Sequence, residues 1–132
     1  MDFPSNSFDY VHIRYLVGSI ADWPALFKQA HDVLKPGAWL ESYDGTPVLE
    51  TDDDTLGENM AKWGTFFVEG GKKIGRSFTV LEDGTQRKAM EEAGFVDIQE
   101  RDFKVKSLFS LTIGGLVLTL ILLGSSGPLA KR

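Results

Sequence analysis

Residues 22–34, with the sequence DWPALFKQAHDVL, decide the fold because they carry the clearest helical periodicity in the chain. Apolar side chains recur there three and four residues apart and form one continuous stripe: Trp23, Leu26, Phe27, Ala30, Val33 and Leu34. Asp22 supplies a side-chain oxygen for the first free backbone N–H groups, and the sequence KPG at 35–37 stops the helix. The pattern therefore predicts a helix with one buried face.

Two strand-like segments flank this helix. Residues 8–15 (FDYVHIRY) are rich in β-branched and aromatic side chains and alternate apolar with polar positions, and residues 38–43 (AWLESY) follow the helix stop. A strand, a helix and a second strand in so short a stretch form a βαβ unit, whose two strands run parallel in one sheet. The predicted fold class is α/β.

The next part of the chain continues the α/β pattern. A second helix is predicted at about 54–68, with Gly70 and Gly71 at its end, and a third at 85–93, ended by Gly94. Residues 95–105 (FVDIQERDFKV) are typical of a strand, but their alternation slips, which predicts a bulge or turn near residues 100–102.

Three local motifs, taken with this order of elements, resemble the C-terminal half of a class I S-adenosylmethionine-dependent methyltransferase. They are SFDYVHIR at 7–14, GSIADWP at 18–24 and LKPGAWLE at 34–41, with a weaker match, AGFVD, at 93–97. They look most like those of fungal methyltransferase-domain proteins that include velvet-complex-associated regulators of secondary metabolism. The resemblance implies a partial Rossmann-like class I methyltransferase sheet, with strands equivalent to strands four to six, and S-adenosylmethionine as cofactor.

Ligands of open α/β sheets bind beyond the carboxyl ends of the parallel strands, which places the ligand locus at residues 13–16 and 43–46. His12 and Arg14 lie at the end of the first strand, where a cation or hydrogen-bond donor can meet a carboxylate. We therefore predict that these two residues bind the cofactor. The alternative is that His12 is packed in the core and Arg14 is a surface charge. No catalytic residue is assigned.

One part of the family pattern is missing. The family holds its cofactor with a glycine-rich loop after strand one and an acidic residue after strand two, whereas none of the 14 glycines here forms a Gly-x-Gly pair. We therefore expect a truncated domain that is inactive alone, with doubtful cofactor binding. Its first strand then has an open edge, which favours self-association or a partner chain.

Charge and composition exclude several other functions. With 19 acidic and 14 basic residues the net charge is −5, so no nucleic-acid partner is expected, and Lys72, Lys73 and Arg76 are interpreted as a solvated loop. The absence of cysteine rules out disulfides, thiolate metal sites and cysteine nucleophiles. Acidic residues 52–54 are explained by the positive end of a helix, and the two histidines lack a zinc spacing, so no metal site is predicted.

No charged residue occurs between residues 107 and 130, which divides the chain into a truncated methyltransferase-like domain at 1–106 and a hydrophobic C-terminal tail at 107–132. Residues 108–126 would form a transmembrane helix of about 28 Å, close to the thickness of a bilayer core. The alternatives are a buried strand at 116–123 (LVLTLILL) that fills the sheet, because short apolar runs do not distinguish strand from helix, and a disordered or aggregating tail.

Two hypotheses for function follow. The first is a methyltransferase half that transfers methyl groups only if another chain supplies the missing cofactor half. The second is a non-enzymatic, membrane-anchored or self-associating interaction module. The protein is expected at a membrane if the tail inserts, and otherwise in the cytoplasm or nucleus.

Overall fold

The computed structural model describes residues 3–49, 56–106 and 115–125. Within these residues, strands and helices follow one another in this order: β1 (Phe8–Arg14), α1 (Trp23–Val33), β2 (Leu34–Leu49), α2 (Glu58–Ile74), α3 (Thr85–Ala93), β3 (Phe95–Lys106) and β4 (Gly115–Ser125).

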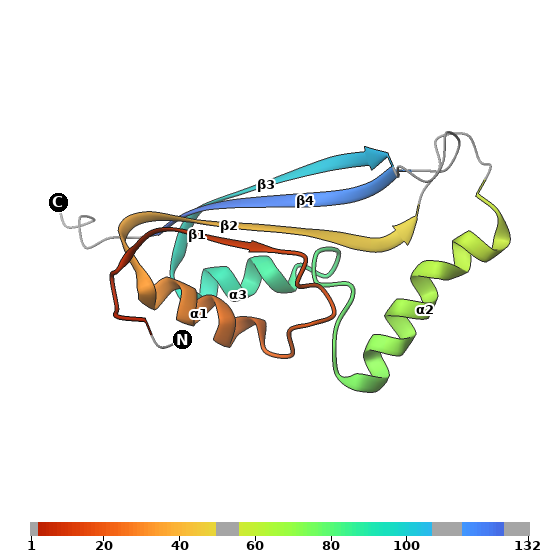
Figure 1. Ribbon diagram of the computed structural model, residues 1–132, viewed down its shortest axis with the longest axis horizontal. Coiled ribbons are helices and arrows are strands. Elements are labelled where there is room, and N and C mark those ends of the chain that lie inside the picture. Colours follow the sequence, from red (N-terminus) through yellow and green to blue (C-terminus); the bar gives the residue numbers. More distant parts are fainter. Residues whose placement is uncertain (1–2, 50–55, 107–114, 126–132) are drawn as a thin grey trace.

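The strands form one sheet in the order β1-β2-β4-β3. β1 and β2 are parallel, as the βαβ prediction requires, whereas β4 lies between β2 and β3 and runs antiparallel to both (Figure 1). Among the described strands, β1 stands at one edge of the sheet and has β2 as its neighbour. The predicted α/β class and the predicted edge position of the first strand are confirmed.

Strand β4 corrects the prediction of a transmembrane helix at 108–126. Residues Gly115–Ser125 are extended and pair along their length with both β2 and β3, so this part of the predicted tail belongs to the same sheet as the preceding strands. The sheet supplies partners for the backbone groups of an apolar run, which the sequence alone could not show. The alternative strand at 116–123 is confirmed, and the remainder of 107–132 lies outside the described residues. Across the described ranges, no helix has the length and apolar character needed to span a bilayer.

Helix α1 forms where its periodicity predicts it. Trp23, Phe27, Ala30 and Val33 are buried, and the side chain of Asp22 accepts a hydrogen bond from the N–H of Ala25 at 2.9 Å. The helix passes directly into β2, which begins at Leu34, so the KPG segment lies inside the strand instead of before it.

Helix α2 differs from its prediction at both ends. It begins at Glu58 and continues through Gly70 and Gly71 to Ile74, and Gly75 ends it in the left-handed conformation with φ of 67°. The acidic residues 52–54 that were expected at its start lie outside the described residues. The two internal glycines therefore do not terminate the helix, and Gly71 has a packing role described below.

The last predicted helix and strand agree more closely with the structure. α3 covers Thr85–Ala93 and ends at Gly94, as predicted. In β3 the register shifts between Val96 and Gln99, where Asp97 has a positive φ of 56°. The predicted bulge exists, but it lies earlier than residues 100–102.

Helices α1 and α3 cover one face of the sheet, and α2 lies beyond the end of β2 (Figure 1). The core between the sheet and these two helices contains Ile13, Trp23, Phe27, Ala30, Leu34, Ala38, Leu40, Val80, Ala89, Met90 and Phe95. Side chains alternate along a strand, so the opposite face of the sheet carries Tyr10 and Trp39, which are about half exposed. The missing side chain of Gly64 allows α2 to approach the end of β2 closely, since a Cβ atom there would lie 3.1 Å from the Cα atom of Val48.

Candidate functional site

β1 ends at Arg14, which pairs with Tyr43, and the parallel strand β2 continues beyond this point to Leu49. After Arg14 the chain turns at Tyr15, which has a positive φ of 54° and donates its N–H to the carbonyl oxygen of Tyr43 at 3.0 Å. The rings of Tyr15 and Tyr43 meet edge to face, with centroids 5.7 Å apart. The turn leaves an opening at the carboxyl edge of the sheet, where open α/β sheets bind their ligands.

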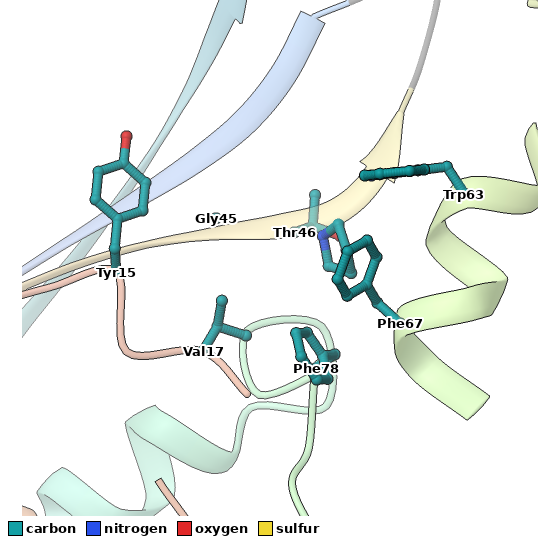
Figure 2. A pocket seen from close by; sticks show the side chains of 8 residues that line it. Tyr15, Val17, Gly45, Thr46, Trp63, Phe67 and Phe78 are labelled. Atoms are coloured by element: carbon teal, nitrogen blue, oxygen red, sulfur yellow. The ribbon is translucent and has the colours of Figure 1, made fainter. Parts of the chain in front are cut away.

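A pocket of about 220 Å³ lies at this edge (Figure 2). Its walls are made by Tyr15, Val17, Gly45, Thr46, Pro47, Trp63, Phe67 and Phe78. Tyr15, Gly45 and Thr46 fall inside the ligand locus predicted from the sequence at 13–16 and 43–46, so the pocket overlaps that locus. None of the eight lining residues carries a charged side chain.

Three aromatic rings form one wall of the pocket. Trp63 and Phe67 project from α2 and contact each other at 5.1 Å between ring centroids, and Phe67 lies 5.4 Å from Phe78. Figure 2 shows Trp63 and Phe67 projecting from α2, with Phe78 between Phe67 and Val17. Trp63 remains 51% exposed, so the wall is open to a molecule arriving from solvent.

The ring of Phe78 is seated between two glycines from different elements. A Cβ atom on Gly18, in the loop after β1, would lie 2.1 Å from the ring, and one on Gly71 of α2 would lie 2.5 Å from it. The N–H of Gly18 also donates to the carbonyl of Ser77 at 3.1 Å. Only residues without a side chain allow this approach, so the two glycines set the position of Phe78 in the wall.

A buried polar network lies next to the pocket. Asp44 of β2 is fully buried and accepts hydrogen bonds from the N–H of Val17 and from the amide of Gln86, both at 3.0 Å. The hydroxyl of Ser42 donates to the other end of the Gln86 amide at 3.2 Å. Burial raises the pKa of Asp44, while the hydrogen bonds from Val17 and Gln86 oppose that rise. The network fixes the loop after β1 to β2 and α3, and Val17 in that loop lines the pocket.

A second polar group lies on the sheet face that α1 and α3 leave uncovered. Glu41 of β2 accepts hydrogen bonds from the hydroxyl of Tyr10 and, at 2.8 Å, from Nδ1 of His12. The hydrogen bond to Glu41 is the main reason why the pKa of Tyr10 rises to about 12, and the same bond lowers the pKa of Glu41. The two residues predicted to bind the cofactor thus have different partners. His12 binds Glu41, whereas the Arg14 guanidinium lies 5.4 Å from the centroid of the Tyr15 ring.

Neither His12 nor Arg14 is among the described residues that line the pocket. Sequence reasoning missed Phe78 and Gln86 as parts of the site, and it included Asp44 in the locus 43–46 without giving it a role. Trp63 and Phe67 lie four residues apart within the helix predicted at about 54–68, and this spacing places them on one helix face and together in the wall. The buried Asp44 had a usable signal, since it follows a strand of the predicted parallel pair at its carboxyl end.

Within the described residues, no three His, Asp or Glu side chains gather as a metal site would require. Lys72, from the basic cluster, forms an ion pair with Glu69 at 2.7 Å on the exposed side of α2.

Solved structures place this architecture among the class I methyltransferases. Phosphoethanolamine N-methyltransferase 2 from Haemonchus contortus, solved with phosphomonomethylethanolamine and S-adenosylhomocysteine, superposes on 96% of this chain with a TM-score of 0.62. The identity is 17% and the match covers 35% of that enzyme, so this likeness shows the fold alone.

The sequence then specifies the family. A family model described as a methyltransferase domain matches residues 1–100, and the chain belongs to that family. The methyltransferase pytC from Aspergillus terreus is 37% identical over 100 residues, which cover 74% of this chain. The secondary metabolism regulator LAE1 from Cochliobolus heterostrophus is 30% identical over 103 residues, which cover 76% of it. The matches span about a third of these relatives, 30% of pytC and 33% of LAE1.

Proposed function

We propose that this chain forms the acceptor-side part of an S-adenosylmethionine-dependent methyltransferase that serves secondary metabolism. The observation that carries the proposal is the pocket at the carboxyl ends of β1 and β2 in a methyltransferase-family sheet. Ligands of such sheets bind at this edge. The secondary-metabolism role rests on the similarity to a protein named as a regulator of that process.

The cofactor fits this chain only in part. The edge of the sheet offers a ligand pocket, and Arg14 supplies a cation at the end of β1. The sequence contains no Gly-x-Gly pair. The space beside Gly18, in the turn after β1, is occupied by the ring of Phe78. We therefore propose that residues beyond these 132 hold the ribose of the cofactor and share its methionine with Arg14, and that the chain does not methylate on its own.

Within this division, His12 and Arg14 have different roles. His12 already binds the carboxylate of Glu41. We therefore propose that it holds the Glu41 side chain in place and does not bind the carboxylate of the cofactor. Arg14 is the residue of the pair that we propose for the carboxylate of the cofactor. The cofactor supplies the methyl group, and the residues of this chain hold the acceptor and keep water from it.

Calorimetry with a chimera tests the proposal. In the chimera, this chain replaces the matched segment of pytC, which leaves the rest of that relative intact. We expect the chimera to bind S-adenosylhomocysteine with micromolar affinity and the 132-residue chain alone to show no binding at that level. A chimera that is folded by circular dichroism but binds no cofactor, while pytC binds it, would contradict the proposal; micromolar binding by the chain alone would contradict the division of the site.

The open edge of β1 supports a second candidate function, association with another polypeptide. β1 ends the strand order of the described sheet, and a strand in that position leaves backbone groups available for pairing. We expect the 132-residue chain to sediment as a dimer or larger species at micromolar concentration. A monomer at all accessible concentrations would remove this candidate and leave the methyltransferase proposal unchanged.

A further inference from the structure

We infer that the pocket at the carboxyl edge of β1 and β2 holds a planar ring without negative charge, so that the methyl acceptor is a non-anionic aromatic small molecule. That the bound ring is the methyl acceptor rests on the proposed function. The character of the pocket itself rests on its walls alone.

The size of the pocket fits one or two fused rings. Its volume of about 220 Å³ exceeds that of an apolar cavity of about 150 Å³, which is sufficient for benzene. The aromatic wall formed by Trp63, Phe67 and Phe78 offers both faces and edges to a ring, because the three planes are inclined to one another by 66° and 47°. Offset and edge-to-face contacts of this kind favour a planar guest.

The lining of the pocket disfavours an anionic guest. The eight lining residues are uncharged, and the carboxylate of Asp44 is buried and already bound by Val17 and Gln86. The cation of Arg14 lies over the ring of Tyr15, outside the lining. A phosphate or carboxylate placed among the aromatic rings would lose water and gain no described ionic partner, which is costly. The Thr46 hydroxyl accepts a hydrogen bond from the N–H of Val48 at 3.2 Å, and its own proton can be donated to a hydroxyl of the guest.

The adenine of the cofactor is also a planar ring without negative charge and is the competing occupant. Position does not separate the two, because both would lie at the carboxyl edge of the sheet. A competition experiment distinguishes the two occupants. An acceptor and the cofactor bind together before methyl transfer, whereas two molecules that use the same pocket exclude each other.

Two matched probes test the inference in the 132-residue chain. 1-Naphthol presents a neutral fused ring with a hydroxyl, and 1-naphthyl phosphate presents the same ring with a charge. We expect calorimetry to show 1-naphthol binding at least tenfold more tightly than the phosphate. Phe67→Ala should weaken 1-naphthol binding roughly 2- to 12-fold, the range of one aromatic contact, while Phe103→Ala, a ring exposed on β3, should leave it unchanged. If Phe67→Ala does not fold, Phe67→Leu keeps most of the apolar volume and should still weaken binding.

Three results would overturn the inference. They are equal affinity for the two probes, equal effects of the Phe67 and Phe103 substitutions, and displacement of 1-naphthol by S-adenosylhomocysteine in the pytC chimera. Displacement would assign the pocket to the adenine and not to the acceptor. A chimera that binds no cofactor would instead contradict the proposed function, while the comparison of probes in the chain alone would still decide the nature of the pocket.

Discussion

Two adjacent glycines of α2 have opposite surroundings. Gly71 is buried, and a Cβ atom there would lie 2.3 Å from the carbonyl oxygen of Arg76 and 2.5 Å from the ring of Phe78, whereas a Cβ atom on Gly70 would meet nothing within 4 Å. We expect Gly71→Ala to destabilise the protein by about 1–3 kcal/mol, the cost of an overpacked site. Gly70→Ala should stabilise it by about 0.5–1 kcal/mol, because alanine is the better helix former. Urea unfolding measures both, and equal effects of the two substitutions would contradict the seating of Phe78.

The buried carboxyl of Asp44 predicts a particular dependence of stability on pH. Its pKa is raised above 3.8, so the folded state binds the proton more tightly than the unfolded state does. The contribution of Asp44 to stability is therefore greatest at low pH and declines as the pH rises from 3.8 through the folded pKa. We expect the advantage of the native protein over Asp44→Asn in the free energy of unfolding to be larger at pH 4 than at pH 7. An advantage that grows with pH would show that hydrogen bonds to the carboxylate outweigh its burial.

Tyr10 predicts a signal at the other end of the pH scale. Its folded pKa is about 12, because its hydroxyl is bound to Glu41, so its hydrogen bond is intact below pH 10 and is lost as the pH rises through the folded value. Absorbance titration of the tyrosines at alkaline pH should show one ionisation near 12 that disappears in Tyr10→Phe. Tyr15→Phe is the matched control and should leave that step in place. A Tyr10 that titrates near 10 would contradict the contact with Glu41.

At the scale of elements, β4 carries the largest difference between expectation and structure. As an inner strand paired with β2 on one side and β3 on the other, its amides are hydrogen-bonded within the sheet. Hydrogen exchange measured by mass spectrometry should therefore find peptides from 116–123 protected more strongly than peptides from the edge strand β1. If peptides from 116–123 exchanged as fast as they do in the urea-unfolded chain, this result would contradict the placement of β4 in the sheet.

The elements that the sequence predicted well are those set by local pattern. The stripe of α1, the capping oxygen of Asp22 and the glycine after α3 each act within a few residues of where they are seen. β4 depends on partners far along the chain, because an apolar run becomes a strand only beside other strands. α2 continues through Gly71, whose missing side chain leaves room for Phe78. The position of the pocket beside the parallel strands was predictable, whereas the Phe78 wall was not, since its loop has no periodic pattern.

At the scale of the whole molecule, the two faces of the sheet differ. Helices α1 and α3 cover one face of the sheet (Figure 1). The other face carries the linked side chains of Tyr10, His12 and Glu41, and the pocket lies where β1 ends beside β2. On this arrangement rests our proposal that the described residues hold the acceptor and that further polypeptide completes the cofactor site. The central claim is that the reactive end of the cofactor meets this edge of the sheet.

Photolabelling tests that claim most directly. Ultraviolet irradiation of the pytC chimera with S-adenosylmethionine carrying a tritiated methyl group attaches the label to residues that touch the cofactor, and excess S-adenosylhomocysteine controls for specific attachment. Within the part contributed by this chain, we predict label in the peptides that contain Arg14–Val17 or Tyr43–Pro47. Label confined to α1, α3 or β3, with those two peptides unlabelled, would contradict the account.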